Sequence, residues 1–111
     1  MSLDKSLFVS ANVHERDVTL ADGTVHPMHF REIPNSKFRR FQLLELSDDI
    51  EQRVRAPAEL IAASLCEPDG SDAITLDEAA TLKPGVARAL VTVIGEVCGF
   101  TAKKASPSAE A

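Results

Sequence analysis

Apolar and polar residues alternate in different patterns along the chain, and the first pattern predicts a β-ribbon. Residues 12–20 are polar with scattered valine and leucine, and the pair Asp22-Gly23 that follows is typical of a type I′ hairpin turn. A second strand is predicted from Val25 to about Ile33. Because Pro27 has no N–H to donate, this strand must either lie at a sheet edge or bulge there.

A two-stranded ribbon alone is only marginally stable in water, so one face of the hairpin needs a cover of helices. The residues expected on the covered face are Val18, Leu20, Val25 and, beyond a bulge, Met28 and Phe30. The predicted fold class is therefore α+β and mainly helical, with an N-terminal β-hairpin packed on a bundle of about four short helices.

The first two helices are predicted from apolar residues spaced three and four apart. One follows Pro34, with a cap at Asn35-Ser36, and its inward residues are Phe38, Phe41 and Leu44, with Leu43 as a further candidate. The next is predicted to start at Pro57, since proline is tolerated in a first turn, and to end before Pro68. The acidic stretch Asp48-Asp49-Ile50-Glu51 is then expected to be a frayed helix end or a loop.

The third and fourth helices have clearer boundaries. Thr75 and Glu78 match a capping box, in which each side chain bonds a backbone N–H at the helix start. Residues 82–85 break this helix, and a fourth carries an apolar face from Val86 to Val97 before Gly99 ends it.

This pattern divides the chain into three parts. Residues 1–11 are an N-terminal segment that can be disordered, and residues 12–100 are a single domain. Residues 101–111 have no apolar periodicity and are predicted to be a flexible tail.

Composition narrows the possible partners. The 111 residues suffice for one domain, and with 44% apolar and 26% charged residues the chain is expected to fold. Its net charge of −5 disfavours nucleic acid and acidic membrane surfaces as partners. No apolar run approaches the ~20 residues that cross a bilayer, and the N-terminus lacks signal-peptide features, so a cytoplasmic location is expected.

No catalytic, cofactor-binding or metal-binding residues are predicted from the sequence. His26 and His29 have a spacing that can hold a metal on a helix, but in a strand it directs the two side chains to opposite faces. Cys66 and Cys98 lie in apolar neighbourhoods, where cysteine usually acts as a small hydrophobe. Five basic residues could contact phosphates, but a solvated face paired with nearby carboxylates is the favoured interpretation. These residues are Lys37, Arg39, Arg40, Arg53 and Arg55. What remains is a small domain suited to docking on other proteins.

The order of these parts has a parallel in a known family. A hairpin leads into Arg31-Glu32-Ile33, a helix over residues 55–65 precedes Asp69-Gly70, a capped helix runs from Thr75 to Leu82, and a last helix runs into Gly99-Phe100. In this order the stretch from Val18 to Phe100 resembles the tail assembly chaperones of long-tailed bacteriophages (siphophages).

The resemblance implies a non-enzymatic protein that acts in the host cytoplasm. Such a chaperone binds the tape-measure protein, recruits subunits of the major tail (tube) protein and is absent from the finished tail. Partner-binding residues expected here are Phe30, Arg31, Phe38 and Phe41, and the phenylalanines are also candidates for contacts with a second copy.

Many such phages also make a longer form by ribosomal frameshifting, and the region of Lys103 and Lys104 is a candidate for that event. An ordinary solvated lysine pair is the alternative. Two other functions stay open: a small helical adaptor or regulatory protein of bacterial origin, and a subunit of an enzyme whose catalytic groups lie on another chain.

Overall fold

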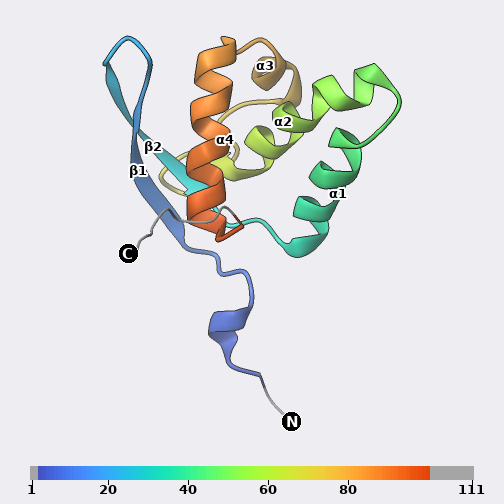
Figure 1. Ribbon diagram of the computed structural model, residues 1–111. Coiled ribbons are helices and arrows are strands. Elements are labelled where there is room, and N and C mark those ends of the chain that lie inside the picture. Colours follow the sequence, from blue (N-terminus) through green and yellow to red (C-terminus); the bar gives the residue numbers. More distant parts are fainter. Residues whose placement is uncertain (1–2, 101–111) are drawn as a thin grey trace, which may run out of the picture.

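A computed structural model describes residues 3–100 of the chain (Figure 1). Over these residues it contains a β-hairpin, a short third strand and four α-helices, with a turn of 3-10 helix at Lys5–Leu7. The predicted α+β class, with an N-terminal hairpin packed on helices, is confirmed. The predictions for the tail and for Lys103 and Lys104 lie outside the described residues.

The hairpin is regular along its whole length. Strand β1 (Val13–Thr19) pairs antiparallel with β2 (Val25–Arg31), from Val13 opposite Arg31 to Thr19 opposite Val25, with no residue skipped. The Leu20 carbonyl accepts from the Gly23 N–H at 2.9 Å, and Gly23 has a φ of 88°. These features belong to a three-residue loop with glycine in the left-handed region, so the predicted two-residue type I′ turn is wrong.

The absence of a bulge between β1 and β2 corrects one core prediction. Alternation along β2 places Met28 and Phe30 on one face and Val25 on the other. Phe30 is fully buried and Val25 is 53% exposed, so the prediction that Val25 shares the covered face is wrong. That prediction assumed a bulge at Pro27, which would have shifted the alternation of side chains between the two faces of β2.

Strand β3 (Leu65–Cys66) pairs only with His29 and Phe30, which makes β2 the middle strand of a three-stranded sheet. Pro27 lies beyond this short pairing, where the second side of β2 has no neighbouring strand. The edge alternative predicted for Pro27 is therefore correct at this point of the strand.

The first two helices form an antiparallel pair. Helix α1 (Asn35–Glu45) begins one residue after Pro34, and no side chain caps it, so the predicted cap at Asn35-Ser36 is wrong. Helix α2 (Ile50–Ser64) begins seven residues before the predicted start at Pro57, because the Asp49 carboxylate caps it by accepting from the Glu51 N–H at 3.0 Å. Pro57 is an interior residue of α2.

The last two helices are close to prediction. Helix α3 (Leu76–Ala80) has the full capping box, with Glu78 N–H donating to Thr75 Oγ1 at 3.1 Å and Thr75 N–H donating to Glu78 Oε1 at 2.9 Å. Helix α4 (Pro84–Cys98) has proline in its first turn, two residues before the predicted start, and ends at Gly99 with φ 80°.

The core lies between the inner face of the hairpin, α2 and α4, which runs alongside the ribbon in Figure 1. The side chains with no exposed surface at its centre are Val18, Phe30, Ile61 and Ile94. Helix α1 packs mainly on α2, so the α1–α2 pair extends from one side of the body.

Candidate protein-docking surface

The aromatic residues predicted to bind partners are used largely inside the fold. Phe30 is fully buried, so it presents no surface to a partner in this structure. Phe38 and Phe41 are half-buried. The Phe38 ring stacks on Phe100, with centroids 4.2 Å apart, and lies 6.4 Å from the Phe41 ring. These three rings join α1 to the end of α4.

Arg31 joins the sheet to two other parts of the chain. Its guanidinium donates to the carbonyls of Ala63 at 3.0 Å and Gly70 at 3.1 Å and forms an ion pair with Asp72 at 2.9 Å. A longer bond of 3.4 Å reaches the Ala62 carbonyl. The last carbonyls of a helix have no partner within the helix, so Arg31 satisfies groups at the end of α2 and in the turn after β3.

His14 and Glu32 form a polar pair that the sequence analysis missed. The His14 Nε2 and Glu32 Oε2 atoms are 2.9 Å apart, and Glu32 Oε1 accepts from the Ser10 N–H at 2.9 Å. These bonds favour the ionised carboxylate, so they lower the pKa of Glu32. The β1–β2 register was the missing signal, because it brings the start of β1 beside the end of β2.

The cysteines lie where a small hydrophobe is expected. Cys66 is buried in β3 and Cys98 is half-buried at the end of α4, and both are free thiols. Burial raises the pKa of each thiol. Across residues 3–100, no three His, Cys, Asp or Glu side chains gather in a way that could hold a metal ion.

Large apolar side chains are exposed where α1 passes into α2. Leu46, Ile50 and Val54, here called the tip patch, are 79%, 63% and 69% exposed. Ile50 and Val54 continue a helical stripe whose other members, Ala58 and Ile61, are buried. The body therefore covers the second half of this stripe and leaves the first half open.

A groove lies between α1 and α2. It has a volume of about 540 Å³, and we call it the α1–α2 groove; its lining residues are Ser36, Arg39, Arg40, Leu43, Leu44, Gln52 and Arg55. Leu43, predicted as a candidate inward residue, is 55% exposed here. The lining contains three arginines and no carboxylate.

The ion pairs around this groove leave positive charge unbalanced. Arg40 binds both oxygens of Glu59, at 2.7 and 3.1 Å, and Arg55 shares the same carboxylate at 3.7 Å. The bond from Arg40 is the main cause of the lowered pKa of Glu59. Arg39 bonds the neutral Gln42 at 3.3 Å and has no ion pair within residues 3–100.

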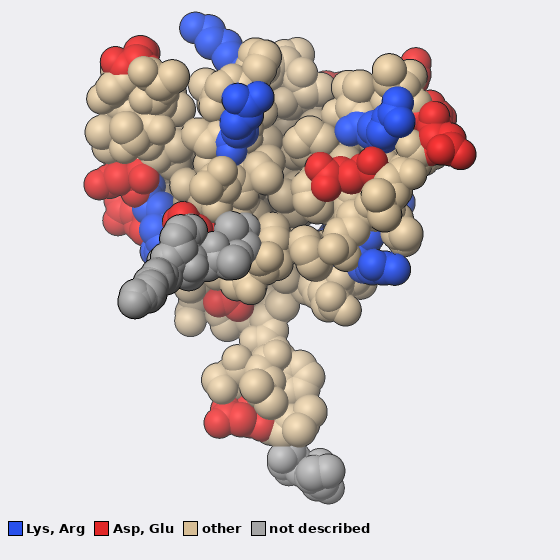
Figure 2. Space-filling model, viewed as in Figure 1, with Lys and Arg blue, Asp and Glu red and all other residues tan. Residues whose placement is uncertain are grey.

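A second exposed apolar group lies on the N-terminal arm, residues 3–9. Its four large apolar side chains, Leu3, Leu7, Phe8 and Val9, are all exposed. The arm projects from the body and is mostly uncharged on the face seen in Figure 2, whereas charges of both signs are scattered over the body. A hollow of about 310 Å³ separates its Leu7, Phe8 and Val9 from Ile33 and Phe38 of the body.

Comparisons with protein-family models, with curated proteins and with solved structures give no match to this chain. None of the helices formed by residues 3–100 combines the length and the apolar character needed to cross a bilayer.

Proposed function

We propose that this protein is a tail assembly chaperone of a long-tailed bacteriophage, which binds the tape-measure protein and recruits tail-tube subunits without catalysing a reaction. The order and spacing of sequence elements between Val18 and Phe100 suggest this family. In this proposal the protein acts in the cytoplasm of the host bacterium and leaves before the tail is complete.

The observation that carries the proposal is the α2 stripe that passes from the core to the surface. Ile50 and Val54 expose apolar surface next to Leu46, and a monomer gains nothing from leaving such a stripe open. Burying a large aliphatic side chain contributes about 1.5–3 kcal/mol, so a partner helix that covers these three residues gains appreciable affinity. An apolar helical partner is the match for such a surface.

The mechanism in this proposal is temporary shielding. A long tape-measure helix exposes apolar stripes along its length, and these stripes aggregate if they meet one another. Chaperone molecules bound through their tip patches cover the stripes until tube subunits replace them. A second copy of the chain is a further expected partner, because the N-terminal arm is also apolar and exposed.

The test is co-expression with the tape-measure protein from the same phage or prophage genome. We expect the chaperone to co-purify with it and to raise its soluble fraction. The variant Ile50→Ser/Val54→Ser should lose most of both effects, since it removes apolar surface without touching the core. Val25→Ser is the matched control, because Val25 is exposed on β2 and far along the chain from α2.

Capture of the tape-measure protein by wild type and both variants alike would reject the tip patch as the contact surface. No capture by any of them, together with binding to an unrelated bacterial protein encoded nearby, would favour the adaptor alternative over the chaperone.

A further inference from the structure

The α1–α2 groove differs from the rest of this acidic molecule in its charge. The chain has a net charge of −5, yet the groove is lined by Arg39, Arg40 and Arg55 and by no carboxylate. Within residues 3–100, Glu59 is the only carboxylate that forms an ion pair with any of these three arginines, and Arg40 already binds both of its oxygens. The groove therefore carries positive charge that a negatively charged partner can neutralise.

The same groove also has an apolar component. Leu43 and Leu44 line it, and Leu43 exposes more than half of its surface. A ligand that offered only negative charge would leave this leucine surface uncovered. A ligand with apolar and acidic groups side by side satisfies both parts of the lining.

From this combination we infer that the α1–α2 groove binds an amphipathic helix whose apolar stripe is flanked by glutamate or aspartate. A cleft between two antiparallel helices is a natural seat for a third helix. Helix α1 has 11 residues and is about 16 Å long, which matches about three turns of a bound helix. Arginine pairs with carboxylates through two parallel N–H bonds, so Arg39 and Arg55 can select for acidic flanks.

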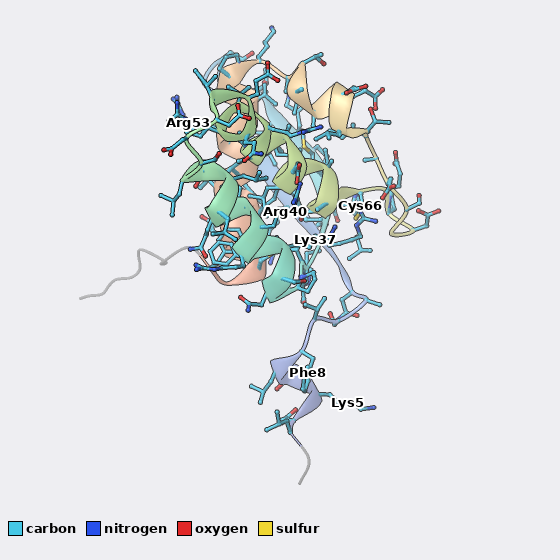
Figure 3. The ribbon with its side chains drawn as sticks, turned by 90° about the vertical axis from the view of Figure 1, so that its right-hand side faces the viewer. Lys5, Phe8, Lys37, Arg40, Arg53 and Cys66 are labelled. Carbon is cyan, nitrogen blue, oxygen red and sulfur yellow. The ribbon has the colours of Figure 1, made fainter. Side chains whose placement is uncertain are left out.

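Of the three arginines that line the groove, Figure 3 labels Arg40. Lys37 and Arg40 lie on α1, whereas Arg53 lies on α2, toward the end where α1 passes into α2. Arg53 does not line the groove and has no ion pair within the part of the chain that the structure describes. It is therefore an internal control for the effect of charge alone.

The inference deepens the proposed function and rests on it, since it specifies which helices of a tape-measure protein are held. The experiment uses the full chain and two synthetic 20-residue helical peptides with the same leucine stripe. One peptide has glutamate beside the stripe and the other has lysine, and each contains a single tryptophan. The protein has no Trp or Tyr, so the fluorescence of the peptide reports binding without background.

We expect the acidic peptide to bind at least tenfold more tightly than the basic peptide at ~0.05 M salt, and this preference to shrink at ~0.5 M salt, where charges are screened. In the variant Arg39→Glu/Arg55→Glu the preference should reverse. The control Arg53→Glu/Arg88→Glu changes the net charge by the same amount at exposed sites outside the groove and should keep the wild-type preference. Leu43→Ser should weaken both peptides, whereas Val25→Ser should weaken neither.

Circular dichroism and thermal melting establish that each variant is folded. Equal affinity of the wild type for the two peptides would overturn the inference, as would a preference that both arginine double variants lose alike. Tighter binding of a single-stranded oligonucleotide than of the acidic peptide, abolished by Arg39→Glu/Arg55→Glu, would overturn it in favour of a nucleic-acid site. A tape-measure protein that binds wild type and Arg39→Glu/Arg55→Glu equally would refute the inference and leave the proposed function standing.

Discussion

At the scale of single residues, Arg31 makes contacts within the fold that the sequence analysis did not predict. It is one of the predicted partner-binding residues, and it also belongs to the Arg-Glu-Ile element of the resemblance. In the structure its guanidinium joins the end of α2, the turn at Gly70 and the carboxylate of Asp72. The sequence could not reveal this, because all of its contacts are more than 30 residues away along the chain.

Arg31→Ala should destabilise the fold by about 2–3 kcal/mol, because it leaves carbonyls of α2 and the turn without donors. Urea unfolding followed by circular dichroism measures this change. Arg53→Ala is the control and should cost less than about 0.5 kcal/mol, since Arg53 is an exposed residue. Equal losses in the two variants would show that the Arg31 contacts add no stability.

The lowered pKa of Glu32 implies that the stability of the fold depends on pH. Its pKa in the folded state is lowered by the Ser10 N–H and by His14. A lowered pKa means that the stabilisation is present above the unfolded pKa of about 4.3 and is lost as the pH falls through the folded pKa. We therefore expect the Tm to fall as the pH drops below about 4.3, and to fall less steeply in Glu32→Gln.

The control for this measurement is Glu15→Gln, which changes an exposed carboxylate of β1. It should retain the wild-type slope of Tm against pH. Glu59 also has a lowered pKa, caused first by its bond to Arg40, so Glu32→Gln should reduce the acid sensitivity without removing it. A slope unchanged by Glu32→Gln would mean that the pair with His14 and Ser10 does not persist in solution.

At the scale of elements, the sequence predicted types and order better than boundaries. The capping box at Thr75 and the glycine at the end of α4 were correct because both signals are local, made by residues within one turn of each other. The start of α2 was wrong because proline can begin a helix or interrupt one, and the sequence favoured the first. Because the start of α2 was misplaced, the sequence analysis did not find the tip patch. It did not find the groove either.

The signal for the tip patch was nevertheless present in the chain. Ile50, Val54, Ala58 and Ile61 follow one another at steps of four, four and three, which is the spacing of a single helical face. Starting the helix at Pro57 cut this stripe in two. The groove could not be predicted in the same way, because it depends on how α1 packs against α2, which no local pattern specifies.

The two halves of the α2 stripe should differ sharply in their effect on stability. Ile61→Ala creates a cavity in the core and should cost about 2–5 kcal/mol. Ile50→Ala removes a side chain that is already exposed and should cost less than about 1 kcal/mol. Urea unfolding of the two variants measures both values. A large loss for Ile50→Ala would show that something within the chain covers the tip patch in solution.

At the scale of the whole molecule, most of the large exposed apolar side chains of residues 3–100 lie in two distant places. The N-terminal arm projects at one end of the body, and the tip patch lies at the end of the α1–α2 pair on another side (Figures 1 and 3). One copy cannot easily cover its own tip patch with its own arm. Contacts between such unlike surfaces of neighbouring copies are head-to-tail, and they form rings or open chains rather than two-fold dimers.

We therefore expect the average mass in solution to rise with protein concentration, as measured by light scattering coupled to size-exclusion chromatography. Leu7→Ser/Phe8→Ser should weaken this association at least tenfold, because burial of each of these side chains contributes about 1.5–3 kcal/mol. Lys5→Ser alters the same arm without removing apolar surface and should associate like the wild type. If Leu7→Ser/Phe8→Ser associates as strongly as the wild type, the arm is not the contact.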